Sequence, residues 1–289
     1  TGDLARAMLH GLRLVEYELL MFAAFWIVIG ILDELAIDAI WGWLRLTGKA
    51  RTHVIADHAA GRELQGRAAV FIPAWQEAGV IGVTIMHALD VWRQKELRIY
   101  VGCYRNDPAT VTAAMAAAAR DTRVRIVIHD ADGPTTKADC LNRLYRALLV
   151  DEKRQHRRAR MIILHDAEDM VHPAALALMD AALGDADLVQ IPVRPEPYPG
   201  GHWISGHYCD EFTESHAKAM VVRDALGAAL PSAGVGCALR RDMLERLEAR
   251  RRLEGPGRGP SGGRDRWRAD GGGAGGGGAA GRGLCAARR

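Results

Sequence analysis

The feature that most constrains the fold is an apolar run that ends in a cluster of carboxylates. Residues 161–164 read Met-Ile-Ile-Leu, and the acids Asp166, Glu168 and Asp169 follow directly. Such a run is typical of a strand buried on both faces of a parallel sheet. Ligands bind at the carboxyl ends of strands in open α/β sheets, and clustered acids repel one another unless cations or protons neutralise them. The segment therefore predicts an α/β fold whose acids hold a divalent metal against a diphosphate.

The rest of the chain supports this fold class, because short apolar runs alternate with helical patterns between residues 68 and 193. The predicted strands are 68–74, 97–104, 124–129, 160–165 and 188–193, and the predicted helices are 78–92, 109–120, 136–149 and 173–183. In a parallel sheet of this kind, residues 73–77, Asp107, 137–139 and 166–169 are expected to converge at one edge. No Gly-x-Gly-x-x-Gly or Walker loop is present, which disfavours an ordinary dinucleotide or ATP site.

The first 50 residues predict a membrane anchor. Residues 19–32 carry no charge, and extension back to Leu12 reaches the length of about 20 residues that a transmembrane helix needs. We expect a span over 12–32 and an interfacial helix, with tryptophans at the headgroup level, over 34–46. A buried core helix or a signal peptide is the alternative, although no Ala-x-Ala-type cleavage site follows.

Basic residues predict the orientation of this anchor. Two precede the uncharged stretch of the span and five follow it: Arg6 and Arg13, then Arg45, Lys49, Arg51, Arg62 and Arg67. The positive-inside rule then places the following domain in the cytoplasm.

Composition limits the partners. The net charge is +3, but residues 255–289 hold seven Arg and two Asp, so the remainder sums to −2 and does not favour nucleic acid. Fourteen of the 32 glycines lie in the same region, which predicts a disordered Gly/Arg-rich tail over 251–289. An RNA-binding tail is an alternative, although Trp267 is its only aromatic residue. The five cysteines form no C-x-x-C pair, so zinc is not expected.

Five motifs in order carry a resemblance to a known family. They are Val-Phe-Ile-Pro-Ala-Trp-Gln-Glu (70–77), Tyr-Arg-Asn-Asp-Pro-Ala-Thr (104–110), Thr-Lys-Ala-Asp-Cys-Leu-Asn (136–142), His-Asp-Ala-Glu-Asp (165–169) and Ser-Ala-Gly-Val-Gly-Cys-Ala-Leu-Arg-Arg (232–241). Together they resemble the membrane-bound family-2 glycosyltransferases over roughly residues 12–250. The anchor and the third motif are most similar to the bacterial phage-adsorption protein B group.

The resemblance implies a GT-A (Rossmann-like) domain over residues 68–250, with a mainly parallel sheet and helices on both faces. A linker over 51–67 would join it to the anchor over 1–50. The implied activity is transfer of a sugar from a nucleotide-diphosphate sugar, expected to be a UDP-sugar, at the cytoplasmic face of the bacterial inner membrane.

The resemblance also implies roles for individual residues. Those expected to bind the nucleotide sugar are Pro73, Ala74, Glu77, Asp107, Lys137 and Asp139. Asp166 and Glu168 stand in the places of the metal-binding Asp-x-Asp motif, with Mg²⁺ or Mn²⁺ as the ion. Gly234 and Gly236 are expected on the acceptor side, where small residues let a sugar approach the backbone.

The resemblance ends at Arg250. The family continues into a Thr-Glu-Asp segment that holds the catalytic base, and neither it nor the Gln-x-x-Arg-Trp motif follows here. No catalytic base is therefore assigned, although proton removal contributes roughly a hundred- to ten-thousand-fold to rates. The alternative function is a catalytically impaired membrane component of an export or phage-receptor assembly, with an outer-membrane or export partner.

Simpler roles remain open for several residues. The acid cluster can cap the helix that begins near Pro173, Asp139 can serve as a first-turn acid, and Lys137 as an exposed lysine. His165 and His172 could form a metal site with Asp169. Ser215 and His216 are expected to be a helical surface pair, since no Gly-x-Ser-x-Gly elbow supports a hydrolase.

Overall fold

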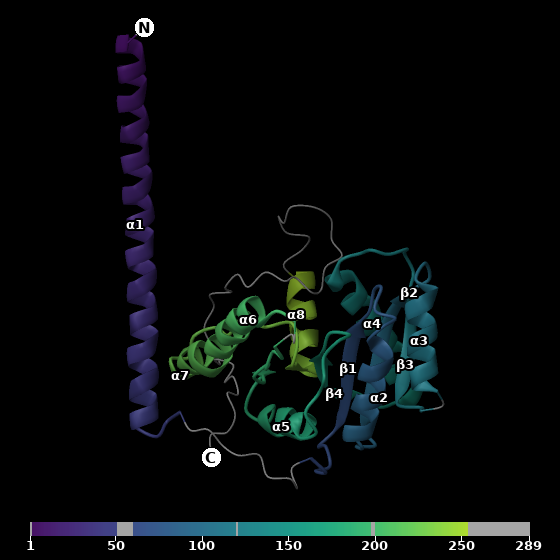
Figure 1. The fold of residues 1–289 in the computed structure, drawn as a ribbon. Coiled ribbons are helices and arrows are strands. Elements are labelled where there is room, and N and C mark those ends of the chain that lie inside the picture. The colour runs from purple at the N-terminus through teal and green to yellow at the C-terminus, as the bar shows by residue number, and fades with distance from the viewer. Residues whose placement is uncertain (1, 51–59, 120, 198–199, 254–289) are drawn as a thin grey trace. The chain divides into compact units, whose positions relative to one another are not determined.

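The computed structural model describes residues 2–50, 60–119, 121–197 and 200–253. It divides the chain into two compact units, Thr1–Arg51 and Thr52–Arg289. The first unit is one uninterrupted helix, α1 (Gly2–Leu46), shown in purple in Figure 1. The segment expected as a separate interfacial helix at 34–46 is therefore a continuation of α1, because no proline breaks the backbone hydrogen bonds between them.

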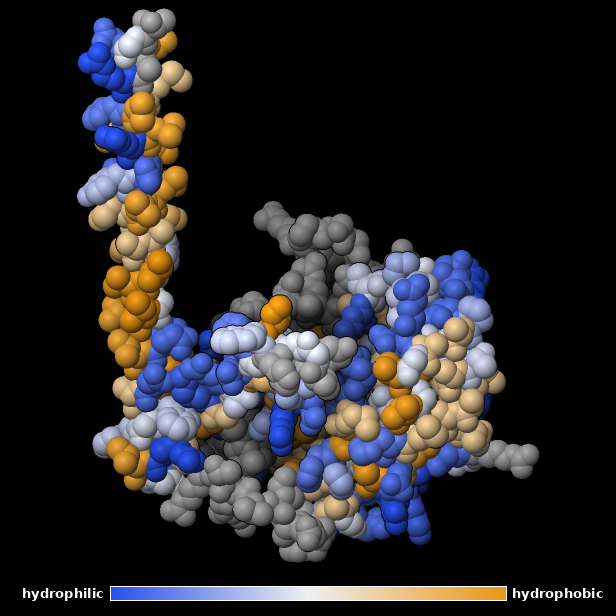
Figure 2. Space-filling model, viewed as in Figure 1, coloured by the Kyte–Doolittle hydropathy of each residue, from blue (hydrophilic) through white to orange (hydrophobic). Residues whose placement is uncertain are grey.

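Apolar side chains cover the middle of α1, where hydrophobic atoms gather in Figure 2. Among the described residues, α1 is the one helix long and apolar enough to cross a membrane, and none of its most apolar window is buried. With 45 residues it extends about 68 Å, more than twice the ~30 Å of a bilayer's hydrocarbon core.

The second unit is built on a six-stranded sheet with the order β3-β2-β1-β4-β6-β5. In its parallel part, β1 (Arg67–Pro73) pairs with both β2 (Leu97–Tyr104) and β4 (Ala159–Leu164), and β2 pairs with β3 (Val124–His129). The predicted strands agree closely with these bounds, because each is a short apolar run enclosed by turn residues.

One strand runs against the others. β6 (Cys237–Arg240) is antiparallel to both of its neighbours, β4 and β5 (Leu188–Gln190). The sheet is therefore mixed but mainly parallel, as expected, and β5 is shorter than the predicted strand at 188–193.

Helices cover both faces of this sheet: α2 (Ile81–Val91), α3 (Pro108–Ala118) and α5 (Ala175–Ala182) pack on one face, and α4 (Lys137–Gln155) and α8 (Arg241–Leu253) on the other. The chain also forms α6 (His202–Glu214), the π-helix η2 (Ser215–Ala219) and α7 (Met220–Ala225) between β5 and β6 in sequence. Residues 51–59 of the predicted linker and 254–289 of the predicted tail lie outside the described residues, while α8 continues to Leu253, past the expected start of that tail.

Two hydrophobic clusters follow from the alternation of side chains along the strands. Ala68, Val70 and Ile72 of β1 pack in one cluster with residues of α2, α3 and α5. Ala69 and Phe71 point to the opposite face, where α4 and α8 pack. The domain thus has three layers, with the central strand buried on both faces.

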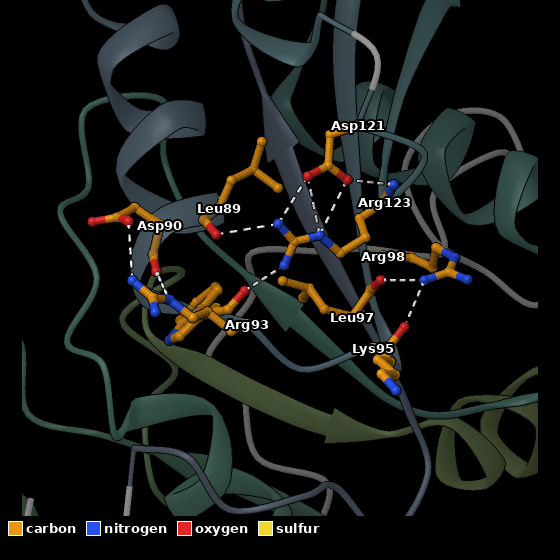
Figure 3. A network of polar contacts seen from close by, with 9 residues as sticks. Leu89, Asp90, Arg93, Lys95, Leu97, Arg98, Asp121 and Arg123 are labelled. Atoms are coloured by element: carbon orange, nitrogen blue, oxygen red, sulfur yellow. Dashed lines mark hydrogen bonds and ion pairs between the residues drawn. The ribbon is translucent and has the colours of Figure 1, made fainter.

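A polar network fixes the end of α2 (Figure 3). The guanidinium of Arg123 donates to the carbonyls of Leu89 (3.1 Å) and Trp92 (2.6 Å). Asp121 accepts from the same guanidinium at 2.8 Å. The last carbonyls of a helix lack intrahelical partners, so this arginine supplies donors that the backbone cannot.

His216 departs from the expected surface position. It lies in η2, is only 4% exposed, and stacks on Phe212 with ring centroids 5.5 Å apart. Burial lowers the pKa of its imidazole below the ordinary value. A π-turn inside a helix displaces the following side chains around the axis, which regular helical spacing does not anticipate.

Candidate functional site

The carboxyl ends of β1, β2 and β4 meet at one edge of the sheet and enclose a cavity of about 290 Å³. Its lining residues are Pro73, Ala74, Trp75, Glu77, Tyr104, Thr135, Lys137, Cys140, Asp166, Ala167 and Glu168. Six of the residues singled out in the sequence are thus together: Pro73, Ala74, Glu77, Lys137, Asp166 and Glu168. They converge because every one of them follows a parallel strand or begins the next helix.

The acidic residues belong to a closed turn after β4. The carboxylate of Asp169 accepts a hydrogen bond from the backbone N–H of Asp166 at 2.8 Å, and the N–H of Asp169 donates to the carbonyl of Asp166 at 3.3 Å. Burial raises the pKa of Asp169, but hydrogen bonds from His165 and from the backbone N–H of Asp166 outweigh burial and hold this pKa below its ordinary value. The turn presents Asp166 and Glu168 to the cavity.

Lys137, the first residue of α4, bridges two segments of the site. Its ammonium group pairs with the carboxylate of Asp166 and lies 3.4 Å from the carbonyl of Gly234. The Lys137 side chain remains 43% exposed, so the pair is open to solvent and to a ligand.

Glu77 adds a third carboxylate to the lining of the cavity. The pKa of Glu77 is raised by partial burial and then by the charges of Glu168, Asp166 and Asp107. The negative charges of Glu77, Asp166 and Glu168 therefore repel one another, which favours a cation between them.

Asp107 does not line the cavity and instead holds the loop after β1. Its carboxylate accepts from the backbone N–H of Gln76 at 2.6 Å and from that of Thr110 at 3.3 Å, at the start of α3. Burial raises the pKa of Asp107, and hydrogen bonds from Thr110 and Gln76 lower it by more. Gln76 has φ 60°, a left-handed conformation that costs energy for a side-chain-bearing residue, and this bond stabilises it.

Asp139 also lies outside the cavity lining. It forms a capping box with Thr136, whose hydroxyl lies 2.9 Å from its carboxylate and 3.1 Å from its backbone N–H. The structure thus gives Asp139 the first-turn role that the sequence left open, and this box fixes the start of the helix that carries Lys137.

The two glycines expected on the acceptor side precede β6 and are not among the residues that line the cavity. Gly234 has φ +77° and Gly236 has φ +60°, conformations that side-chain-bearing residues rarely adopt. A Cβ on Gly236 would lie 3.2 Å from a side-chain carbon of Ile191. Of the pair, Gly234 reaches the site, through its carbonyl contact with Lys137.

An aromatic wall is the part of the site that the sequence analysis missed. Trp75 and Tyr104 meet edge to face with centroids 5.1 Å apart, and Tyr104 stacks on His129 at 5.0 Å. The Tyr104 hydroxyl is 2.7 Å from that of Thr135. Trp75 and Tyr104 stand inside the quoted motifs, so an aromatic residue at or just after the end of a strand was the available signal.

The thiol in the lining is not a nucleophile at neutral pH. Burial raises the pKa of Cys140 to about 11 and that of Cys103, behind it, to about 12. Both therefore stay protonated, and covalent cysteine chemistry is disfavoured.

The histidines considered as metal ligands have other partners. The His165 Nδ1 lies 3.1 Å from the Asp169 carboxylate, and the His172 Nδ1 accepts from the backbone N–H of Ala174 at 3.2 Å. Within the described residues no group of three or more His, Cys, Asp or Glu side chains is placed to hold a metal ion. Any ion at this site needs ligands from a bound molecule or water.

Comparison with protein families gives a match over residues 66–271 to the family described as "Glycosyltransferase like family 2". The match passes Arg250, where the sequence analysis ended the resemblance, and enters residues outside the described part of the chain.

Two curated proteins are similar over most of this chain. Bacteriophage adsorption protein B of Escherichia coli (strain K12) is 35% identical over 251 residues, which cover 86% of this chain and 33% of that protein. Bacteriophage N4 adsorption protein B of Escherichia coli O157:H7 gives the same values. This chain spans about a third of the length of these relatives.

Solved structures are similar at lower identity. A mannosyltransferase from Pyrobaculum calidifontis, in complex with GDP-Man and Mn²⁺, has a TM-score of 0.49 at 19% identity, covering 73% of this chain and 54% of that one. Glucosyl-3-phosphoglycerate synthase from Mycobacterium tuberculosis, with Mn²⁺, UDP and phosphoglyceric acid, has a TM-score of 0.39 at 18% identity, covering 66% and 63%.

Proposed function

This chain belongs to glycosyltransferase-like family 2, and from that membership we propose that it transfers a sugar from a nucleotide-diphosphate sugar with the help of Mg²⁺ or Mn²⁺. The observation that carries the proposal is one cavity at the carboxyl edge of the sheet that combines an aromatic wall, a lysine and two carboxylates. Aromatic rings can stack on a nucleotide base, a lysine can bind phosphate, and carboxylates can bind a divalent metal ion. A UDP-sugar is the proposed donor.

In this proposal the donor lies across the cavity. Trp75 and Tyr104 offer ring faces or edges to the base, with Pro73 and Ala74 below it, and Lys137 offers its ammonium group to the diphosphate. The phosphates would replace Asp166 as the partner of Lys137. The acceptor sugar would enter from the side of Gly234 and Gly236.

The residues present fit a metal ion of this kind. Mg²⁺ commonly takes one or two carboxylates and completes its shell with waters and substrate phosphates. Asp166 and Glu168 supply two carboxylates from one turn, and Glu77, whose pKa is raised by burial and then by their charges, lines the same cavity. A bound ion would stabilise negative charge on the leaving diphosphate.

The proposal is tested by calorimetric titration of the purified full chain with UDP, with and without Mn²⁺. We expect binding that Mn²⁺ strengthens, and an Asp166→Ala variant in which that strengthening is lost. Metal-independent binding, or an unchanged Asp166→Ala, would contradict the proposal. Donor hydrolysis assays then test turnover.

We further propose that α1 anchors the chain in a bacterial inner membrane, with the catalytic domain in the cytoplasm. Its length, hydropathy and exposed apolar side chains support this. Arg67 does not support this orientation, because it is only 4% exposed and pairs with Glu96 inside the domain. Arg45 and Lys49 still follow the apolar stretch. Protease accessibility in inverted vesicles tests the orientation.

Similarity to two bacteriophage adsorption proteins supports a second candidate. In this alternative the chain is a component of a phage-adsorption or export assembly that works without turnover. Sugar transfer by the purified chain would exclude it. Loss of phage adsorption in a deletion strain, restored equally by wild type and by Asp166→Ala, would favour it.

A further inference from the structure

The turn that carries Asp166 and Glu168 is held on both sides by side chains outside the cavity lining. At its start, the Asp169 carboxylate accepts from the N–H of Asp166 (2.8 Å) and lies 3.1 Å from the His165 ring. At its centre, the hydroxyl of Thr84 donates to the carbonyl of Ala167 at 2.6 Å. Ala167 is the residue between the two carboxylates.

Thr84 comes from a different part of the chain. It lies on α2, 83 positions before Ala167, and is 3% exposed. Its hydroxyl also lies 3.3 Å from the carbonyl of Val80, one turn earlier in the same helix, so the shorter contact across to Ala167 dominates. A buried carbonyl without this donor would be left unsatisfied, which costs about 1–3 kcal/mol.

The same helix region holds the rest of the loop. His87 Nε2 lies 2.9 Å from the carbonyl of Val171, and Trp92 Nε1 donates to the carbonyl of His172 at 3.1 Å. These contacts lie beyond the acidic pair, whereas Thr84 donates to the carbonyl of Ala167 and Asp169 accepts from the N–H of Asp166, within the segment that carries the pair.

We propose that Thr84 and Asp169 are positioning residues that fix the backbone from Asp166 to Glu168 in the one conformation that presents both carboxylates to a metal-bound diphosphate. This inference rests on the proposed function. Supporting residues of this kind set ligand geometry at metal sites, and their loss typically weakens metal affinity about 10- to 100-fold.

The variants isolate this role. Thr84→Val removes the hydroxyl at nearly constant volume, and Thr84→Ser keeps it. Asp169→Ala removes the second contact, and Asp169→Asn retains one acceptor oxygen. The matched control is Tyr100→Phe, which removes another buried hydroxyl, 3.0 Å from Asp151, on a residue outside the cavity lining.

For each full-length variant, calorimetry measures UDP affinity with and without Mn²⁺, and thermal melting measures stability. The expected result is a gain from Mn²⁺ that falls about tenfold or more in Thr84→Val and Asp169→Ala, while metal-free UDP affinity stays within about threefold. Thr84→Ser and Tyr100→Phe should keep the gain, whatever their melting temperatures.

Two outcomes overturn the inference while the proposed function stands. One is a full gain from Mn²⁺ in Thr84→Val and Asp169→Ala. The other is an equal loss in Tyr100→Phe, which would show general destabilisation. If the wild type itself shows no gain from Mn²⁺, the proposed function fails, and this inference fails with it.

Discussion

At the scale of single residues, Lys137 is central to the site before any ligand binds. In the structure its ammonium neutralises Asp166, the same carboxylate that we propose as a metal ligand. A Lys137→Met variant should therefore bind UDP about tenfold more weakly, because a charged hydrogen bond to phosphate is lost. It should also bind Mn²⁺ more tightly when no nucleotide is present, because Asp166 is released. Calorimetry with each ligand alone measures both effects.

UDP affinity should fall while Mn²⁺ affinity rises, and these opposite changes make the prediction specific. A Lys137→Arg variant keeps the positive charge and serves as the control, with Mn²⁺ affinity close to that of the wild type. If Lys137→Met lost affinity for both ligands in parallel, damage to the fold would explain the result better than a released carboxylate.

Gly133 gives a second residue-scale prediction, because it supports the aromatic wall. A Cβ at this position would lie 2.3 Å from a ring carbon of Trp75, so Gly133→Ala must displace the indole or the loop. We expect weaker UDP binding with or without Mn²⁺, and destabilisation of about 1–3 kcal/mol from overpacking. Gly61→Ala, where nothing lies within 4 Å of the added carbon, is the control for both measurements.

Local sequence located only part of this site. Glu77, Lys137 and Asp166 could be predicted because each follows a strand or begins a helix, and parallel strands carry such positions to one edge. Thr84 could not, since its role depends on a contact across 83 positions. Asp107 and Asp139 were expected at the nucleotide, but hydrogen bonding to nearby backbone, a general tendency of aspartate, places them outside the cavity lining.

At the scale of elements, strand content was predictable and strand order was not. The apolar runs gave β1 to β4 nearly residue by residue, because burial on both faces demands them. Nothing in the alternation shows that the late strand β6 inserts in reverse between β4 and β5. That pairing places the Gly234 carbonyl beside Lys137, so tertiary contacts supply the last part of the site.

The end of α2 is the element whose stability is most directly testable. Arg123→Met should remove the two hydrogen bonds to the carbonyls of Leu89 and Trp92 and the partner of Asp121, and destabilise the domain by about 1–3 kcal/mol. Denaturant unfolding at neutral pH measures this. Since α2 carries Thr84, a weaker response of UDP binding to Mn²⁺ should accompany the loss.

The destabilisation caused by Arg123→Met should become smaller at low pH. Hydrogen bonding to Arg123 holds the pKa of Asp121 below its ordinary value, despite partial burial that raises it. A lowered carboxyl pKa contributes stability that is complete above the unfolded-state value of about 3.9 and is lost as the pH falls through the folded-state value. The difference in stability between wild type and Arg123→Met should therefore narrow below about pH 4. A constant difference would mean that the ion pair contributes little.

At the scale of the whole molecule, the chain divides into two compact units. Among the described residues, both hydrophobic clusters of the second unit are made from residues between 64 and 244. A chain lacking residues 1–50 should therefore fold with one cooperative transition and bind UDP within about twofold of the full chain. It should also leave the membrane fraction, in which we expect the apolar stretch of α1 to retain the full chain. Fractionation, circular dichroism melting and calorimetry measure these three properties, and a truncated chain that aggregates or loses UDP binding would show that α1 supports the domain as well as anchoring it.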